Sequence, residues 1–135
     1  ADALVPVSAR GARGRARHVL GKNAAAPVPL LAYSQESGLG RIAQAMLGRR
    51  LDALAPKVVF TAHLASVLRT MALDGRGIAW LPRTLIDEDI AAGTLVQAGG
   101  EEWVVPLQVR LYRGRAPMGT AVEAFWKAAH RHARP

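Results

Sequence analysis

The sequence has 135 residues, which is room for one ordinary domain or for one lobe of a larger one. Half of the residues are hydrophobic and 21% are charged, a balance typical of a chain that folds around a core. The absence of cysteine excludes disulfides, thiolate metal sites and a cysteine nucleophile, and the 5% of aromatic residues argues against a stacking platform for single-stranded nucleic acid.

The net charge of +8 is concentrated at the two ends of the sequence. Residues 1–22 carry five basic and one acidic residue, and residues 110–135 carry six basic and one acidic. Either contacts with phosphates or simple solvation of the termini explains this distribution, and the scarcity of aromatic residues favours solvation. No apolar stretch is long enough to span a bilayer and no signal peptide is recognisable, so we expect a cytoplasmic protein without a membrane partner.

The first third of the chain predicts two strands separated by a loop. Residues 4–7 are an apolar run, in which Pro6 indicates an edge or a crossover position. Residues 8–29 lack periodicity and predict a long surface loop. Residues 30–33 predict a buried strand that ends in a polar cluster, residues 34–38, rich in potential helix caps.

The middle of the chain predicts two helices with a strand between them. Residues 38–54 carry apolar side chains at helical spacing, and Pro56 closes the segment. The β-branched and aromatic residues 57–61 predict a strand. A second amphipathic helix is expected over residues 64–72, stopped at Asp74 and Gly75.

The last part of the chain predicts alternating strands and helices. Residues 77–81 predict a buried strand, after which Thr84, as an N-cap with Asp87 three residues on, is expected to open a short helix that Gly93 ends. Short strands are expected at 95–96 and, by alternation, at 103–112, and a final helix from residue 120. This order predicts an α/β fold with a largely parallel sheet. Because the first strand lacks obvious partners, the chain resembles part of a larger two-lobed domain.

Two polar clusters at predicted strand ends are the candidate binding residues. Ser34, Gln35 and Ser37 lie where strand 30–33 turns into a helix, and the alternative is that the serines only cap that helix. The segment Thr61, Ala62 and His63 lies at the corresponding end of the next strand, with a purely structural histidine as the alternative. Since ligands of parallel sheets bind at the carboxyl ends of strands, we interpret the two clusters as one binding rim.

The sequence predicts neither catalysis nor a bound cofactor or metal. No phosphate-binding loop, nucleophile elbow or zinc-binding helix motif is present, and His130 and His132 are expected on different faces of a helix. The rim lacks an orienting partner for acid–base or nucleophilic chemistry. A small hydrolase that uses Ser37 and His63 is nevertheless kept as an alternative function to test.

Residues 68–83, Leu-Arg-Thr-Met-Ala-Leu-Asp-Gly-Arg-Gly-Ile-Ala-Trp-Leu-Pro-Arg, resemble a segment of the effector-binding domain of LysR-type transcriptional regulators. Residues 4–7 resemble its first crossover strand, residues 29–38 the start of its second subdomain, and residues 103–113 with 124–126 its closing strand and helix. Nearly the whole chain is covered, and the order and spacing of these pieces carry the resemblance.

The resemblance implies a fold like that of type 2 periplasmic binding proteins, with an effector cleft between two α/β subdomains. The expected parts are a crossover strand at 1–7, a complete second subdomain at 8–77, a return crossover at 78–82, and at 83–135 the returning C-terminal part of the first subdomain. The winged helix-turn-helix and the first half of the first subdomain have no counterpart here, so DNA binding is expected only through that N-terminal segment.

The resemblance also implies the function. A small polar or anionic effector would contact Ser34, Gln35, Ser37, Thr61, Ala62 and His63, and would alter the geometry of a homo-oligomer that controls transcription. The alternative is a free-standing solute-binding protein of the same fold. Oxidant sensing through Met46 or Met71 is a further possibility in such a family, but both methionines lie at core spacing, which favours packing.

Overall fold

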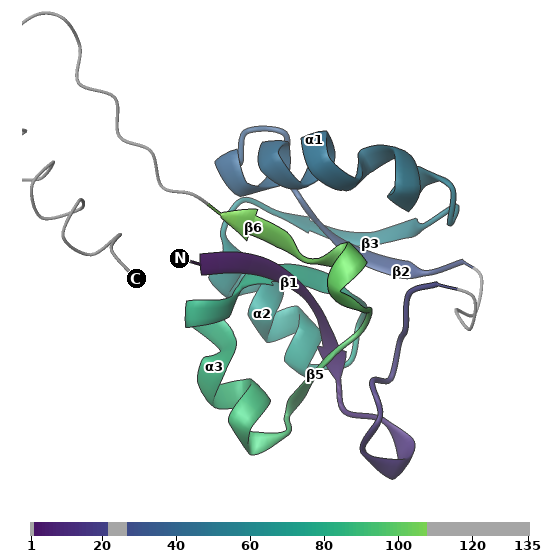
Figure 1. Ribbon diagram of the computed structural model, residues 1–135, viewed down its shortest axis with the longest axis vertical. Coiled ribbons are helices and arrows are strands. Elements are labelled where there is room, and N and C mark those ends of the chain that lie inside the picture. The colour runs from purple at the N-terminus through teal and green to yellow at the C-terminus, as the bar shows by residue number, and fades with distance from the viewer. Residues whose placement is uncertain (1, 22–26, 108–135) are drawn as a thin grey trace, which may run out of the picture.

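The computed structural model describes residues 2–21 and 27–107, and its central element is the first strand (Figure 1). β1 (Asp2–Ala9) pairs antiparallel with β4 (Ala79–Pro82) along one edge. Along its other edge it pairs antiparallel with β5 (Leu95–Gln97) and with β6 (Val105–Leu107), which lie one after the other. All residues of β1 from Ala3 onward are buried, because the strand is covered on both faces.

A second, two-stranded sheet carries the polar clusters. β2 (Pro29–Tyr33) and β3 (Lys57–Ala62) run parallel, joined by α1 (Gly38–Asp52). The first part of β2 is tied to the chain just before β4: the Leu31 N–H donates to the Ile78 carbonyl and the Ile78 N–H donates to the Pro29 carbonyl, both at 2.9 Å. The parallel pair therefore continues the larger sheet at one corner.

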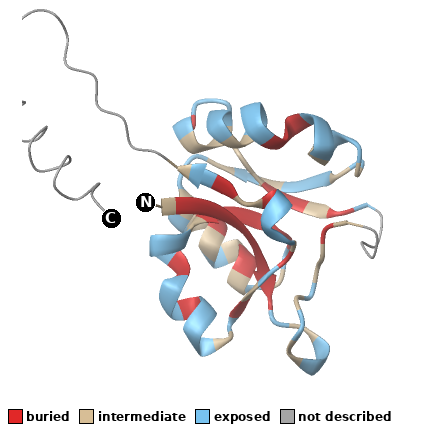
Figure 2. Cartoon of the chain, viewed as in Figure 1, coloured by how far each residue is buried: buried red, intermediate tan, exposed pale blue. Residues whose placement is uncertain are grey.

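The helices cover opposite faces of this assembly. The odd-numbered side chains of β1 face α2 (Ala65–Leu73) and α3 (Arg83–Ala92), whereas Leu4 belongs to the cluster that also includes Leu47 of α1. Two short 3₁₀ turns, η1 (Ala12–Gly14) and η2 (Glu101–Trp103), complete the described elements. The buried residues follow the centre of the sheet, and the outer faces of the helices are exposed (Figure 2).

Two hydrophobic clusters form the core, one on each face of β1. The cluster under α2 and α3 contains Ala3, Val5, Val7, Leu31, Leu68, Ala72, Ala79, Leu81, Ile86 and Leu95. The cluster on the α1 side contains Leu4, Leu20, Val28, Leu30, Leu47, Ile78, Trp80, Ala98, Trp103 and Val105.

The mixed α/β fold and most expected elements are confirmed, but the expectation of a largely parallel sheet is wrong. Only β2 and β3, with the bridge at Ile78, are parallel; all three strands that pair with β1 are antiparallel to it. The alternation of strands and helices predicted parallel pairing between sequence neighbours. Here β1 instead pairs with strands some 70 to 100 positions later in the chain, so no single crossover helix sets its direction.

Of the two positions that Pro6 indicated, the edge strand is wrong for a geometrical reason, and the crossover position remains a prediction. β6 pairs with residues 2–4 and β5 with residues 7–9, so Pro6 lies in the gap between them. Its carbonyl still accepts a hydrogen bond from the Ala98 N–H at 2.8 Å. A proline fits this central strand because the N–H that it lacks falls where no strand is paired.

The predicted loop 8–29 is more structured than expected. Ser8 and Ala9 belong to β1, and Leu20 and Val28 are buried in the cluster on the α1 side. The expected strand from Trp103 begins only at Val105, since Trp103 itself ends η2. Its continuation beyond residue 107 and the final helix lie outside the described residues.

Helix boundaries agree with the sequence except at one cap. Ser37 caps α1, and Gly93, with φ 78°, ends α3 as expected. The predicted capping box at Thr84 and Asp87 is wrong: Pro82 precedes α3, and the Thr84 N–H and hydroxyl both donate to the carboxylate of Asp2, at 3.3 and 2.7 Å. A side chain from β1 thus takes the role of the helix cap.

The expected subdomain boundaries at 7/8, 77/78 and 82/83 remain predictions. The cluster under α2 and α3 includes Leu31 and Leu68 from the segment 8–77 together with Ile86 and Leu95 from the segment after residue 83. Among the described helices, none is long and apolar enough to cross a membrane.

Candidate functional site

The structure brings the two polar clusters together at one edge of the parallel pair. β2 and β3 are in register at their ends, with Tyr33 beside Ala62, and the Ser34 N–H donates to the Ala62 carbonyl at 2.9 Å. The segments that follow the two strands are therefore neighbours. We call the six residues of this edge the strand-end rim: Ser34, Gln35, Ser37, Thr61, Ala62 and His63.

Ser37 has a structural task in the rim. It is buried, and its hydroxyl accepts a hydrogen bond from the Gly40 N–H at 3.2 Å, which satisfies one of the free donors at the start of α1. Its own N–H donates to the Ser34 carbonyl at 3.0 Å and so closes the turn between β2 and α1. The interpretation of Ser37 as a helix cap is therefore confirmed.

The hydroxyl of Ser34 is different. Its oxygen is buried, and among the described residues it has no hydrogen-bond partner. The backbone of Ser34 is fully engaged, since its N–H donates to Ala62 and its carbonyl accepts from Ser37. A buried hydroxyl without a partner costs free energy, so Ser34 offers a hydrogen-bonding group that none of the described residues uses.

The other members of the rim are accessible. Gln35, Thr61 and His63 are exposed and Ala62 is half-buried. No hydrogen bond joins Ser37 to His63 within the described part of the chain, and the Ser37 hydroxyl already serves the helix. The rim therefore provides hydrogen-bonding groups around a helix start but not the nucleophile and base that a hydrolase needs.

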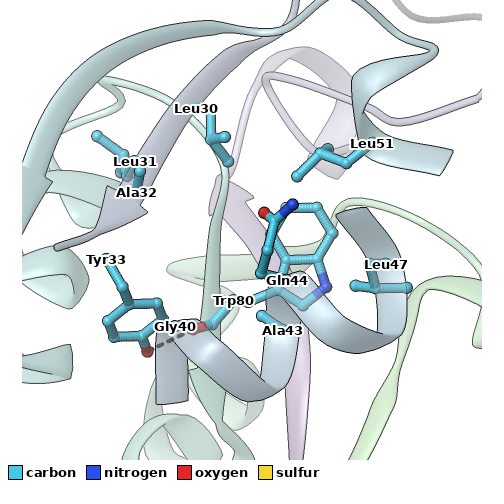
Figure 3. Close-up of a pocket in the computed structure, with 10 residues that line it drawn as sticks. All are labelled: Leu30, Leu31, Ala32, Tyr33, Gly40, Ala43, Gln44, Leu47, Leu51 and Trp80. Carbon is cyan, nitrogen blue, oxygen red and sulfur yellow. Dashed lines mark hydrogen bonds between the residues drawn. The ribbon is translucent and has the colours of Figure 1, made fainter. Parts of the chain in front are cut away.

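An apolar cavity of about 100 Å³ lies next to the rim, between α1 and the sheet (Figure 3). Tyr33 and Gly40, which flank the rim serines, lie at one end of the cavity and Leu51 at the other. The Tyr33 hydroxyl donates to the Trp80 carbonyl at 2.6 Å, and burial raises the pKa of Tyr33 well above its usual value. The lining consists of Leu30, Leu31, Ala32, Tyr33, Gly40, Ala43, Gln44, Leu47, Leu51 and Trp80.

Sequence reasoning did not identify this cavity. Tyr33 and Trp80 were expected only as parts of buried strands, and Gln44 was not singled out. The sequence does contain one signal for the lining residues. The apolar spacing of α1 places Ala43 and Leu47 on the side of the helix that faces the sheet, where they line the cavity. The empty space arises from the distance between helix and sheet, which no local pattern reports.

The two methionines that were expected in the core lie in different environments. Met71 is half-buried and packs against the cluster under α2 and α3, but Met46 is 57% exposed on α1, so the core expectation is wrong for Met46. The described residues include no group of three or more His, Asp and Glu side chains able to hold a metal ion. His130 and His132 lie outside the described residues.

Comparison with known proteins gives the family. The model of the LysR substrate binding domain matches residues 1–134. The chain is 38% identical over 125 residues to the HTH-type transcriptional regulator YjiE of Escherichia coli K12, and 38% identical over 99 residues to the HTH domain-truncated transcriptional regulator QseD of Escherichia coli O157:H7. These alignments cover 92% and 73% of the chain but 40% of each relative, so the chain spans well under half of their length.

Solved structures agree with this result. The regulatory domain of HypT from Salmonella typhimurium, a hypochlorite-specific LysR-type transcriptional regulator, is 35% identical and superposes with a TM-score of 0.78 over 96% of this chain and 60% of that one. The same domain has been solved with a bromide ion bound, at 34% identity and a TM-score of 0.76. The relatives are transcriptional regulators and not enzymes. The chain belongs to the LysR family of transcriptional regulators and corresponds to their substrate-binding, or regulatory, domain.

Proposed function

We propose that this domain senses a small polar or anionic effector at the strand-end rim, between the two subdomains expected from the sequence. The observation that carries the proposal is the buried hydroxyl of Ser34, which lacks a partner among the described residues although the N–H and the carbonyl of Ser34 are both hydrogen-bonded. An effector that accepts or donates one hydrogen bond there removes the cost of that unpaired group.

The start of α1 favours a negatively charged effector group. The first turn of α1 has no acidic residue, and its free N–H groups and the helix dipole give that end a partial positive charge. Thr61 and His63 add accessible donors from the neighbouring strand end. A regulatory domain in the same family takes up a bromide ion, which is consistent with anion binding in this fold.

The signal that follows binding is a shift in population between states. A ligand held between two lobes favours the arrangement in which both lobes contact it, and this changes the geometry of any oligomer built from the domain. YjiE is named as an HTH-type regulator and QseD as an HTH domain-truncated one. We therefore assign operator recognition to a helix-turn-helix outside these 135 residues, in a protein that acts in the cytoplasm.

A titration with bromide and with acetate tests the rim. Backbone amide resonances of residues 35–40 should shift with either anion, and Thr61→Val should weaken binding by roughly 2- to 10-fold, the equivalent of one lost hydrogen bond. Thr70→Val is the matched control, since Thr70 is exposed on α2 away from the rim. Ser34→Ala should weaken binding without lowering stability, because the lost hydroxyl has no partner within residues 2–21 and 27–107.

The test also separates a binding role from a structural one. Ser37→Ala removes a helix cap and should cost about 0.5–2 kcal/mol of stability, whereas Ser34→Ala should not. Anion-induced shifts that are the same in the Thr61→Val and Ser34→Ala variants as in the original chain would show that the rim is not the site.

Self-association is the second part of the proposal. α1 exposes Ile42 and Met46 one helical turn apart, and the edge strand β3 exposes Val58 and Val59. Large apolar side chains on a helix and on a strand edge that no other described strand pairs are typical of surfaces that another chain covers. We name these four residues the α1–β3 face and propose that it contacts a second copy of the domain.

Met46 supports oxidation as a second candidate signal. Hypochlorous acid transfers one oxygen to a thioether, leaving chloride and a methionine sulfoxide, and the reaction needs an accessible sulfur. Met46 is 57% exposed and lies on the α1–β3 face, and HypT is named as hypochlorite-specific. A polar sulfoxide at that position would weaken an apolar contact between copies.

Peptide mass spectrometry after graded hypochlorite treatment tests this candidate. We expect Met46 to be oxidised before Met71, which packs against the core, and we expect the oligomer to dissociate as Met46 is converted. Met46→Leu keeps the apolar surface and should make the oligomer resistant to hypochlorite. Dissociation that persists in the Met46→Leu variant would contradict a role for this residue.

A further inference from the structure

The loop that follows β1 is a closed, arginine-rich projection. Within residues 10–17 the Gly11 N–H donates to the Arg15 carbonyl at 2.6 Å, and the Arg17 N–H donates to the Ala9 carbonyl at 2.8 Å. A bridge between Arg10 and Ala16 closes the base of the loop. We call residues 10–17 the arginine loop; it extends away from the body of the domain with η1 at its tip (Figure 1).

The tip of the loop holds an arginine in an unfavourable conformation. Arg13 and Gly14 both adopt left-handed backbone angles, with φ of 59° and 73°. Glycine adopts this conformation without strain, whereas a residue with a side chain does so at a cost. The turn therefore carries an arginine at a position where glycine would be less strained.

The loop concentrates positive charge without a compensating carboxylate. Arg10, Arg13, Arg15 and Arg17 are all exposed. The ion pairs in the described part of the chain join other arginines to Asp89 and Asp74, so none of these four takes part in one. Four arginines on an eight-residue loop, whose main chain is held by backbone hydrogen bonds, form a surface suited to several phosphates at once.

The chemistry of the loop distinguishes among polyanions. A membrane surface is bound by cations that alternate with large apolar side chains, and the only other side chains here are those of two alanines. Single-stranded nucleic acid needs aromatic residues for stacking, and the loop has none. Duplex DNA presents a regular row of phosphates and requires only rigidly held cations.

We propose that the arginine loop is a sequence-independent contact for the phosphate backbone of duplex DNA. The contact is separate from the effector rim, and it is additional to operator recognition by a helix-turn-helix. The contact holds the regulatory domain against DNA next to the operator. A conformational change in the domain then acts on DNA through both the arginine loop and the helix-turn-helix.

Fluorescence anisotropy with two 20-base-pair duplexes of different sequence tests the proposal, using the 135-residue chain between about 50 and 200 mM salt. The original chain should bind both duplexes equally, and the affinity should fall as salt rises. Arg13→Gln combined with Arg15→Gln should reduce the slope of log K against log salt by about two, since each lost phosphate contact removes about 0.9.

A matched control has the same change of charge elsewhere. Arg41→Gln combined with Arg49→Gln removes two exposed arginines from α1 and should leave the slope nearly unchanged. Arg13→Gly removes the same charge without adding backbone strain, because glycine adopts the left-handed conformation of residue 13 freely. This variant should keep or raise the thermal midpoint of unfolding while it weakens DNA binding. Equal losses in the loop and control variants would overturn the proposal, because binding would then depend only on net charge.

Two other results also overturn it. No binding by the original chain at about 50 mM salt would show that the loop does not contact DNA at all. Binding to vesicles containing phosphatidylserine that is as tight as binding to DNA, and is lost in the same loop variant, would identify a membrane surface as the partner instead.

Discussion

At the scale of single residues, the structure uses side chains from distant parts of the chain to complete local geometry. Asp2 in β1 accepts two hydrogen bonds from Thr84 at the start of α3 and so replaces the missing cap. Tyr33 at the end of β2 donates to the Trp80 carbonyl in β4. Such contacts connect elements that lie far apart in the chain, and removal of one partner costs the other a hydrogen bond.

Asp2 predicts an acid-sensitive contribution to stability. Partial burial alone would raise its pKa, but hydrogen bonds from the Thr84 hydroxyl and from backbone N–H groups outweigh burial and lower it. Because the pKa is lower in the folded state, the stabilisation is present above the unfolded value of about 3.9 and is lost as the pH falls through the folded value. Thr84→Val should therefore destabilise the domain at pH 6 and have a smaller effect at the lowest pH at which it still folds.

Urea denaturation curves at several pH values measure this effect. Thr94→Val is the control, because the Thr94 hydroxyl donates to the Asp89 carbonyl, a group that does not titrate. A difference between Thr84→Val and the original chain that stays constant over the acid range would contradict the role assigned to Asp2.

At the scale of elements, α1 is the least buried of the three described α-helices. Only Leu47 and Gly48 of its 15 residues are buried, and the cavity beside Tyr33 lies under its inner face. Its C-terminal end is held by Arg50, whose guanidinium donates to the Glu102 carbonyl and lies 5.3 Å from the ring centre of Trp103. A helix with few buried residues and with apolar side chains on its outer face is suited to contacts with another chain.

The α1–β3 face predicts how the oligomer is disrupted. Met46→Glu combined with Val58→Lys should convert an associated species into a monomer, because each substitution places a charge in an apolar contact. Sedimentation velocity over a range of concentrations measures the change. Ile90→Glu on α3, where Ile90 is 42% exposed, is the control and should leave association unchanged.

The reverse pattern would relocate the interface. A monomeric original chain at high concentration would contradict self-association altogether. Dissociation caused by Ile90→Glu but not by the double substitution would transfer the contact to α3.

At the scale of the whole molecule, one core connects the segments that the sequence assigns to different subdomains. Leu68 of α2 is fully buried in the same cluster as Ile86 of α3 and Leu95 of β5. Arg69 of α2 also donates two hydrogen bonds to the Asp89 carboxylate of α3, at 2.7 and 2.9 Å. Contacts of this kind make the described elements depend on one another during unfolding.

This continuity predicts a single unfolding transition. Leu68→Ala should lower stability by about 2–5 kcal/mol and shift the curves from circular dichroism and from tryptophan fluorescence together. Leu64→Ala, at an exposed position just before α2, should have little effect. Two separate transitions, only one of which responds to Leu68→Ala, would show that the parts unfold independently.

The local sequence pattern was sufficient to predict the structural features that depend on residues close together in the chain. Helical spacing predicted α1 and α2, the serines at 34 and 37 offered a helix cap that Ser37 provides, and Asp74 with Gly75 predicted the end of α2. The adjacency of the two rim clusters also followed, since the ends of parallel neighbouring strands meet at one edge. The order of these segments was sufficient to suggest the family.

Tertiary structure decided the features that depend on distant partners. The antiparallel direction of β1, the capping of α3 by Asp2 and the exposure of Met46 all depend on which segment packs against which. That the Ser34 hydroxyl is buried and has no partner among the described residues likewise depends on how distant segments pack around it. Periodicity reports the environment of a residue along its own element, whereas strand direction, burial and hydrogen-bond partners are set by contacts between elements far apart in the chain.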